Sequence, residues 1–397
     1  MPSLARWLVA VVLGTLALLL WPKHAEAYPW MIRHEYRSCP TCHTDPSGGG
    51  LLTKYGRVQA AVLLSSRFAG GPEDDPGKTK DFLFGAIELP EQLDLQAWLR
   101  NAYMINMQRG DVVDDRLLFM RADVGAHVAL GAFRASGTIG AAHPDARALT
   151  QDTWVTSNVD GVNLVSREHW AGVALLDEAL LIRAGRLNMP FGLRNVEHNT
   201  WVRSATRTDI NQHQQHGVAA AYNGEKIRGE LMAVLGNYQL GPDAYRERGY
   251  SAFAEYAVLP KLGAGVSSSV LRADADVATR RPVWRQGHGI FARYSPWKPL
   301  ALMAEADLVI KSVKLDNPST DVAGMLQADV EVLQGLHLVG TGELLTQARQ
   351  NATLVGGWIS AWWFLFAHVD ARIDLVHRTV AENPATTTLL FQLHGWL

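Results

Sequence analysis

Most of the chain after residue 90 alternates between apolar and polar residues. From 93 to 107 most odd positions are apolar, whereas Asp94, Gln96 and Arg100 stand on even positions. Side chains of a strand point alternately to its two faces, so each such run has one apolar and one polar face. Runs of about ten residues separated by Gly, Pro, Asn and Asp are typical of a transmembrane β-barrel. Further runs lie at 118–130, 180–187, 217–222, 228–238, 251–258, 263–271, 287–294, 300–309, 324–332, 336–344, 354–364, 366–376 and 389–397.

Two of these runs predict specific orientations. Between 118 and 130 the apolar side chains stand on even positions, so we expect Leu118 and Met120 on the apolar face and Arg121 on the wet face. In the run 389–397 the polar face carries His394 and Trp396, and the chain stops at Leu397. This run resembles the last strand of outer-membrane barrels, which usually ends on an aromatic residue, although here the aromatic residue is penultimate.

A soluble β-sheet protein is the alternative to a membrane barrel. A β-sandwich or propeller with one wet face would alternate equally well. Aromatic residues near the ends of runs, such as Trp98, Trp284 and Trp358, favour the barrel because they suit its interfacial girdles. We therefore predict an all-β fold in which residues 81–397 form a porin-like antiparallel barrel of about 14 to 16 strands. Outer loops are expected at 140–160, 197–215, 239–249, 273–285 and 315–321.

The first 27 residues predict export. Arg6 leads into an apolar run from Trp7 to Trp21, and Ala25-Glu26-Ala27 follows as a cleavage pattern of small residues. We expect a signal peptide over 1–27. Later apolar runs are shorter than the roughly 18 residues of a membrane helix. The net charge of −2 argues against a nucleic-acid partner. Together these features predict the cell outer membrane, with its lipid, as the location.

The two cysteines of the chain belong to one motif, Cys39-Pro40-Thr41-Cys42-His43. CxxCH is the attachment signature of a c-type haem, in which Cys39 and Cys42 form thioethers and His43 is the proximal ligand of the iron. A disulfide at this spacing would be strained, and a zinc site would lack a second pair of ligands. Haem c is attached outside the inner membrane, which agrees with the predicted export.

The sequence does not decide which residue is the sixth ligand of the iron. His34 lies five residues before Cys39 and could fold back over the distal face. Met31 is close by and would give a higher potential. Barrel residues such as His213, His216 or Met189 are further candidates.

Residues 28–80 are predicted to form the haem-binding segment. They are too few to enclose a haem with a core of their own. Ser47-Gly48-Gly49-Gly50 indicates a turn, one amphipathic helix follows over 52–66, and 73–78 is a linker. The economical arrangement is a plug in the barrel mouth or lumen, with the barrel wall completing the pocket.

The run from Gly185 to Leu193, with Pro190-Phe191-Gly192 inside it, resembles a turn of phosphate-selective and related porins. The resemblance implies a loop that constricts the lumen. Five arginines could then line the bore, or they could be ordinary residues of a wet face; they are Arg183, Arg186, Arg194, Arg203 and Arg207.

In architecture the whole chain resembles the fused outer-membrane cytochrome-porins, of which the iron-oxidising members are best known. The specific likeness lies in Tyr28-Pro29-Trp30, Arg33-His34-x-Tyr36, the single CxxCH and Tyr55-Gly56-Arg57. It implies haem c on Cys39 and Cys42, with His43 proximal. It also implies electron flow from an extracellular donor, such as Fe(II), to a periplasmic c-type cytochrome or another acceptor.

Two classes of function therefore compete. One is an electron conduit across the outer membrane. The alternative is a porin for small solutes in which the haem segment is a structural or sensing plug. A soluble periplasmic cytochrome with an appended β domain is a third. We find no glycine loop for phosphate and no nucleophile motif, so hydrolytic or transferase activity is not expected.

Overall fold

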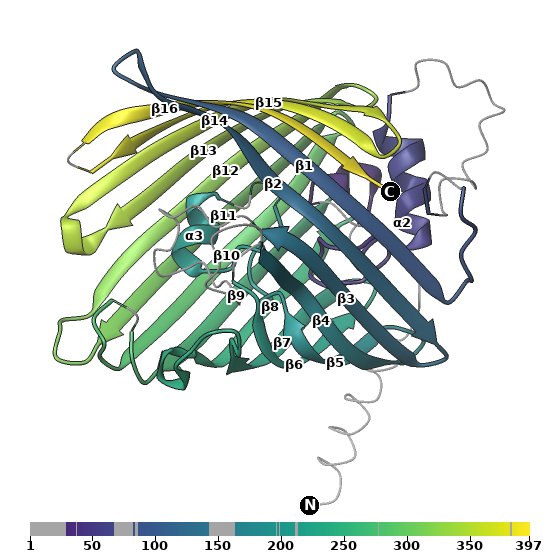
Figure 1. Cartoon of the computed structure of the whole chain (residues 1–397), viewed down its shortest axis with the longest axis horizontal. Coiled ribbons are helices and arrows are strands. Elements are labelled where there is room, and N and C mark those ends of the chain that lie inside the picture. Colours follow the sequence, from purple (N-terminus) through teal and green to yellow (C-terminus); the bar gives the residue numbers. More distant parts are fainter. Residues whose placement is uncertain are drawn as a thin grey trace, which may run out of the picture.

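A computed structural model describes residues 29–36, 38–66, 82–83, 86–142, 163–195, 197, 199–210, 213–276, 278–381 and 383–397. The predicted signal peptide, 1–27, lies outside them. In the described residues sixteen antiparallel strands close into one barrel, in which each strand pairs with its neighbours in sequence and β1 pairs with β16 (Figure 1). The strands are β1 (Leu93–Gln108), β2 (Asp111–Leu130), β3 (Phe133–Ala142), β4 (Asn163–Leu175), β5 (Leu180–Leu187), β6 (Gln215–Asn223), β7 (Ile227–Gly236), β8 (Arg248–Leu259), β9 (Leu262–Ala273), β10 (Val283–Trp297), β11 (Leu300–Val313), β12 (Ser319–Leu333), β13 (Leu336–Gln347), β14 (Ala352–Phe366), β15 (Val369–Val380) and β16 (Asn383–Trp396).

The helical elements are short. They are the 3₁₀ helix η1 (Pro29–His34), the helix α2 (Lys54–Gln59), the π-helical turn η2 (Ala60–Leu64), α3 (Trp201–Thr206), and the single turns η4 (Asp243–Tyr245) and η5 (Ala348–Gln350). α2 and η2 together occupy the place of the one helix predicted over 52–66. No helix in the described residues is long and apolar enough to span a membrane.

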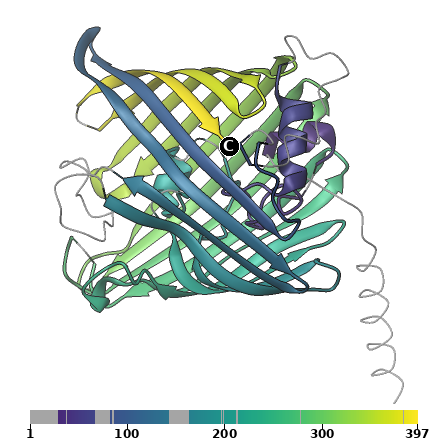
Figure 2. The ribbon, with the colours of Figure 1, turned by 45° about the vertical axis from the view of Figure 1, so that its right-hand side comes forward.

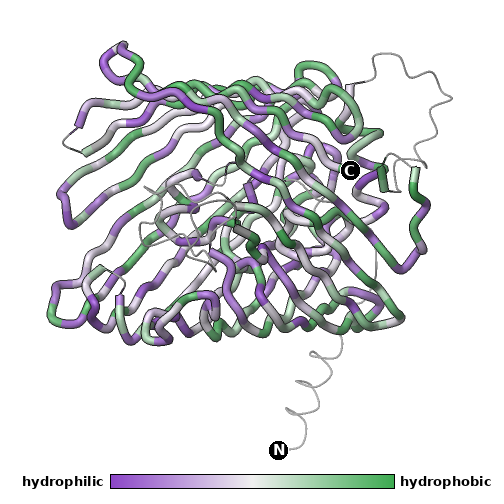
Figure 3. Tube along the Cα trace, in the orientation of Figure 1, coloured by the Kyte–Doolittle hydropathy of each residue, from purple (hydrophilic) through white to green (hydrophobic). Residues whose placement is uncertain are grey.

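The predicted all-β barrel is confirmed, with a strand number inside the expected range. On β1 the side chains of Gln96, Trp98 and Ala102 are buried, whereas Leu99 and Tyr103 are exposed on the outer face. Figure 3 shows the same alternation of hydrophilic and hydrophobic residues along the strands. Because side chains alternate across a strand, this pattern gives the barrel an apolar outer face and a polar interior.

The orientation predicted for the start of β2 is wrong. Leu117 and Phe119 are exposed, at 74% and 53%, whereas Met120 lines an interior cavity. The β1–β2 ladder shifts register between Arg100 and Asn101, so the alternation changes phase at this point. A bulge adds one residue to a strand and turns consecutive side chains to the same face. As a result both Met120 and Arg121 line the interior cavity.

The structure also contains two strands that the sequence analysis missed. Half of β3, which reads FRASGTIGAA, is Ala and Gly, so its apolar face is weak. In β4 the pairing shifts opposite Thr138 and Ile139, which interrupts the alternation, and the outward His169 is polar. Alternation of apolar and polar residues does not reveal a strand where the outward residues are small or where a bulge changes the phase.

The two ends of the barrel differ. The seven connections at one end, from β2–β3 to β14–β15, contain two to four residues each. The other end carries the long connection between β5 and β6, and four of the predicted outer loops, 197–215, 239–249, 273–285 and 315–321, belong to it. The predicted loop 140–160 lies outside the described residues from 143 on. In outer-membrane barrels the short turns are periplasmic and the longer loops extracellular. The start of β1 and the C-terminal end of β16 are therefore at the periplasmic end.

The N-terminal segment, residues 29–66, lies inside the barrel near this short-turn end (Figures 1 and 2). It contacts several of the short turns. Arg33 donates to the carbonyl oxygen of Pro299 at 3.2 Å, the Ser66 amide donates to that of Phe364 at 2.8 Å, and Ser38 donates to the side chain of Asn223. The segment therefore lies where the sequence analysis expected it, and its role as a haem-binding plug stays a prediction.

The connection between β5 and β6 crosses the lumen. The Gly192 amide donates to Ser267 on β9 at 2.8 Å, and the Leu193 amide donates to Glu305 on β11 at 3.0 Å. Further along, the Trp201 amide donates to Glu343 on β13 at 2.7 Å. α3 follows inside the barrel (Figure 1). This geometry agrees with the constricting loop that the porin-like turn implies.

Candidate functional site

The CxxCH motif forms a tight turn. The amides of Cys42 and His43 both donate to the carbonyl oxygen of Cys39, at 3.1 and 2.9 Å. The Cys42 carbonyl accepts from the Thr53 amide at 2.9 Å, which ties the turn to the start of α2. Both cysteines are buried, and no disulfide joins them in this structure.

A buried charge network fixes the segment just after this turn. The carboxylate of Asp45, which is fully buried, accepts hydrogen bonds from Arg183 at 3.1 Å and Asn188 at 2.7 Å. Arg183 also donates to Glu230 at 2.7 Å, and Arg194 donates to Ser47 at 2.8 Å. Burial alone would raise the pKa of Asp45, but the guanidiniums of Arg183 and Arg194 hold it below its usual value.

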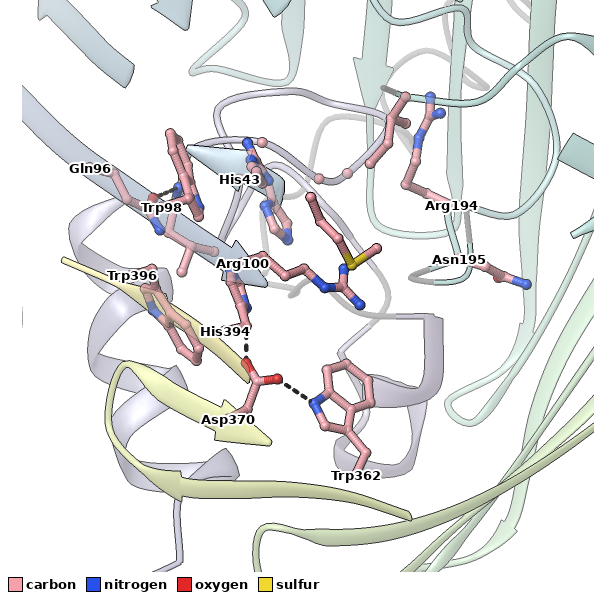
Figure 4. Close-up of a pocket in the computed structure, with 17 residues that line it drawn as sticks. His43, Gln96, Trp98, Arg100, Arg194, Asn195, Trp362, Asp370, His394 and Trp396 are labelled. Atoms are coloured by element: carbon pink, nitrogen blue, oxygen red, sulfur yellow. Dashed lines mark hydrogen bonds and ion pairs between the residues drawn. The ribbon is translucent and has the colours of Figure 1, made fainter. Parts of the chain in front are cut away.

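A cavity lies beside His43, between the N-terminal segment and the wall formed by β1 and β16 (Figure 4). It contains about 1090 Å³ of empty space, part of which is open to solvent. The chemistry of its lining decides which ligand it suits.

Three indoles and three guanidiniums line this cavity. Trp98, Trp362 and Trp396 come from three strands, β1, β14 and β16. The guanidiniums belong to Arg100, Arg121 and Arg194. Flat aromatic walls suit an aromatic macrocycle, and arginine is the preferred partner of carboxylates. This lining fits a haem, which offers a flat ring and two propionates.

Two imidazoles line the same cavity among the described residues, those of His43 and His394 (Figure 4). Burial lowers the pKa of His43 to about 4, so its ring is neutral at physiological pH, as a metal ligand must be. His394 stands on β16, and its Nδ1 lies 2.9 Å from Oδ2 of Asp370 on β15. Trp362 Nε1 donates to the other oxygen of Asp370 at 2.8 Å.

The thiol of Cys39 stands at the edge of the cavity rather than in its wall. Cys39 Sγ accepts a hydrogen bond from Arg228 at 3.1 Å. A Cβ on Gly48, a residue that lines the cavity, would lie 3.1 Å from the same sulfur. Gly48 has a φ of 95°, which favours glycine, so only a bare backbone separates Cys39 from the cavity here.

The structure does not bring the predicted distal ligands to this cavity. His34 Nε2 lies 3.7 Å from Glu331, and its ring lies 6.3 Å from that of Tyr36. Met31 is 3% exposed and packs in a hydrophobic cluster with Trp30. Neither side chain lines the cavity beside His43. The assignment of His34 or Met31 as sixth ligand stays a prediction from sequence alone.

The other candidate ligands lie elsewhere. His213 lines a second cavity with Arg207 and Glu247, His216 packs at 4.8 Å from the ring of Tyr238, and Met189 is buried in a separate cluster. Four of the five arginines predicted for the bore are buried and hydrogen-bonded, for example Arg203 to Glu305 and Arg186 to Asn237. Arg207 is partly exposed, 3.6 Å from Glu247.

The sequence analysis missed most of the cavity wall. His394 and Trp396 were placed on the polar face of the last run, and that signal was correct. Closure of the predicted barrel implies that the last strand pairs with the first, but nothing in a single sequence gives the register that places His394 opposite Arg100. The bulge that turns Met120 inward carried no sequence signal either.

The chain is similar in fold to solved outer-membrane proteins. An OmpT loop-deletion variant of Vibrio cholerae matches with a TM-score of 0.59 and 12% identity, over 77% of this chain and 99% of that chain. The outer-membrane channel DcaP of Acinetobacter baumannii matches with 0.52 and 13%, over 77% and 97%. OmpF of Salmonella typhi in complex with daunomycin matches with 0.55 and 12%, over 77% and 97%. No protein-family model and no curated protein sequence matches the chain.

These likenesses identify the fold as that of the outer-membrane porins. A closed barrel has no free strand edge, and its apolar outer face suits lipid. The protein is therefore a β-barrel of the cell outer membrane, as the sequence predicted.

Proposed function

We propose that the protein carries electrons across the outer membrane through one haem c, bound by Cys39 and Cys42 with His43 as the proximal ligand. One observation carries the proposal: the CxxCH turn lies inside the barrel, and its His43 lines a cavity whose wall also carries three indoles and three guanidiniums. The haem would supply a one-electron redox centre. A covalent attachment motif would otherwise be an odd device in a porin lumen.

The chain's own side chains would shape the environment of such a centre. Trp98, Trp362 and Trp396 form apolar walls that would limit the contact of such a group with water. Arg100 and Arg121 present positive charge to the cavity, and Arg121 lies 2.5 Å from Asp123 and 4.4 Å over the ring of Trp98. Fixed guanidiniums in a partly buried site stabilise carboxylates more strongly than they would in water.

The position of the cavity favours particular partners. His394 and Trp396 stand near the C-terminal end of β16, and Asp370 stands near the start of β15, so the cavity reaches the short-turn end. A periplasmic c-type cytochrome or similar acceptor would dock there. Because electron tunnelling falls steeply with distance, an extracellular donor has to enter the lumen. A small soluble donor, of which Fe(II) is one, suits this geometry better than a mineral surface does.

The second candidate is a porin for small solutes with a plugged lumen. The likeness to solved channels favours it, because those proteins share the whole barrel. Against free passage, residues 29–66 and the β5–β6 connection both occupy the lumen of this barrel. In this alternative the Cys39–His43 turn would only help to fill the lumen.

Proteoliposomes separate the two candidates. The purified protein is inserted into vesicles that contain an oxidised periplasmic-type cytochrome c, and Fe(II) is added outside. We expect reduction of the enclosed cytochrome, seen by its absorbance, at a rate that the Cys39→Ala, Cys42→Ala variant lowers to that of empty vesicles. Swelling of the same vesicles in sugars measures solute passage. Rapid swelling with equal reduction rates for parent and variant would favour the solute porin.

A further inference from the structure

Of the two ring nitrogens of His394, Nδ1 has a hydrogen-bond partner and Nε2 has none in the described part of the chain. Nδ1 lies 2.9 Å from Asp370, and because a carboxylate accepts hydrogen bonds, Nδ1 donates to it. The proton of the neutral ring is then on Nδ1, and Nε2 keeps its lone pair. In the part of the chain that the structure describes, this Nε2 is buried and has no hydrogen-bond partner.

A buried lone pair without a donor costs free energy unless something binds it. Ligating histidines commonly donate their other ring N–H to a carboxylate, which fixes the tautomer, orients the ring and increases its basicity. The Asp370–His394 pair has this arrangement, and Trp362 holds Asp370 by donating to its second oxygen at 2.8 Å. His394 is thus oriented in advance as a ligand for a metal in the cavity.

The candidate partner is on the same cavity. His43, the histidine of the CxxCH motif, comes from the N-terminal segment, and His394 comes from the last strand of the barrel (Figure 4). The cavity thereby receives one imidazole from each side of the interface between segment and wall. Met120 also lines it and has a thioether, but a thioether has no N–H with which a carboxylate could orient it as Asp370 orients the ring of His394.

We propose that His394 is the sixth ligand of the haem iron, bound through Nε2 opposite His43, and that Asp370 is a positioning residue for its ring. The inference rests on the proposed function, because it needs the haem that Cys39, Cys42 and His43 would hold. It replaces His34 and Met31 as the distal ligand. It also makes the barrel wall, and not the N-terminal segment, the source of the second bond to iron.

Optical and electron paramagnetic resonance spectra of the purified protein in detergent test the proposal. The parent should show six-coordinate, low-spin ferric haem without a sulfur-to-iron charge-transfer band. His394→Ala should keep the covalently attached haem and convert it to a high-spin form, and added imidazole should restore the low-spin spectrum. His34→Ala and Met120→Leu are the matched controls and should both remain low-spin.

A second variant guards against a folding defect in the first. His394→Met replaces one possible ligand by another, so it should produce a sulfur-to-iron charge-transfer band that the parent lacks. Heat-modifiable migration in gels reports whether each variant has folded. Asp370→Asn should stay low-spin but raise the midpoint potential, because a less basic imidazole stabilises the ferric state less.

The contrary results are distinct. A low-spin His394→Ala spectrum without added imidazole, or a parent charge-transfer band that Met120→Leu removes, would overturn the assignment of His394 while leaving the haem in place. A high-spin His34→Ala spectrum would return the role to His34. A folded parent that carries no haem at all would overturn the proposed function and this inference with it.

Discussion

Arg183 on β5 joins the N-terminal segment to the barrel wall by donating to Asp45 at 3.1 Å and to Glu230 at 2.7 Å. All three side chains are buried. A buried charge that loses its partner costs about 3 to 5 kcal/mol, because desolvation is no longer compensated. The CxxCH turn begins at Cys39, only six residues before Asp45. The contact between Asp45 and Arg183 is therefore a strong determinant of where this turn lies in the lumen.

Replacing Asp45 by Asn should loosen the segment without opening the barrel. The amide keeps the shape but loses the charge opposite Arg183, so we expect the free energy of local opening to fall by about 3 kcal/mol. Hydrogen exchange of the amides of 38–53 measures this loss. The control is Asp243→Asn, which removes an exposed partner of Arg246 and Arg248 and should leave the same amides unchanged. Equal exchange in parent and Asp45→Asn would show that the network does not hold the segment.

The contact between Asp45 and Arg183 should weaken as the pH falls. The folded-state pKa of Asp45 is depressed, so its contribution to stability is present above the ordinary aspartate pKa of about 4 and is lost as the pH falls through the depressed value. We expect protection of 38–53 to be constant from pH 7 to about pH 4 and to decrease below it. In Asp45→Asn the decrease should be smaller. If hydrogen-exchange protection already falls between pH 7 and pH 5, a titratable group other than Asp45 controls the docking of the segment.

Glycine is required where α2 approaches the CxxCH motif. A Cβ on Gly56 would lie 2.4 Å from the carbonyl oxygen of Cys42 and 2.9 Å from its Cα. Since both contacts are to backbone, Gly56→Ala should displace α2 or the turn, at a cost of about 1 to 3 kcal/mol. We expect less covalent haem per barrel, measured by haem stain against protein stain. Gly340→Ala, where a Cβ would meet nothing within 4 Å, should not change that ratio.

Strand alternation was sufficient to predict the barrel, but not the cavity. The faces of β1 and β16 followed from period two alone, as Leu99 and Leu393 on the outside and Gln96 inside demonstrate. The phase of β2 did not, because a bulge is a matter of pairing and not of composition. The cavity depends on that bulge and on the closure of β16 onto β1, which joins residues almost three hundred positions apart, as in the contact of Arg100 with Gln392.

The prediction of a distal ligand rests only on distance along the chain. His34 and Met31 were chosen because they lie close to Cys39 in the sequence. In η1 Met31 packs in the core, and neighbouring Arg33 pairs with Asp329, which also contacts His337 at 2.9 Å. These contacts between segment and wall have no signal in a single sequence, so the sixth ligand could not be derived from it.

Removal of both thiols should separate haem binding from barrel formation. The sixteen strands pair with one another independently of Cys39 and Cys42, so the Cys39→Ala, Cys42→Ala variant should reach the outer membrane and remain heat-modifiable. It should lose haem stain in denaturing gels, because a noncovalent haem dissociates there. Loss of the barrel from the membrane fraction would mean that the haem motif is needed for folding. Haem stain that survives denaturation would contradict attachment at this motif.

Deleting residues 29–66 while keeping the first 28 residues should convert the protein into an open pore. This segment fills the short-turn end of the lumen and makes buried contacts with the wall at Arg183, Asp329 and Gln96. Without it only the β5–β6 connection crosses the lumen among the described residues, so single-channel conductance in planar bilayers should rise several-fold. Since the CxxCH motif is deleted as well, the conductance should no longer depend on whether haem is supplied. The variant that lacks only the thiols is the matched control, and its conductance should stay near that of the parent because the segment remains docked. If the parent conducts as well as the deletion variant, the segment does not occlude the lumen. In that case free solute passage, and not electron transfer, would be the main activity of this barrel.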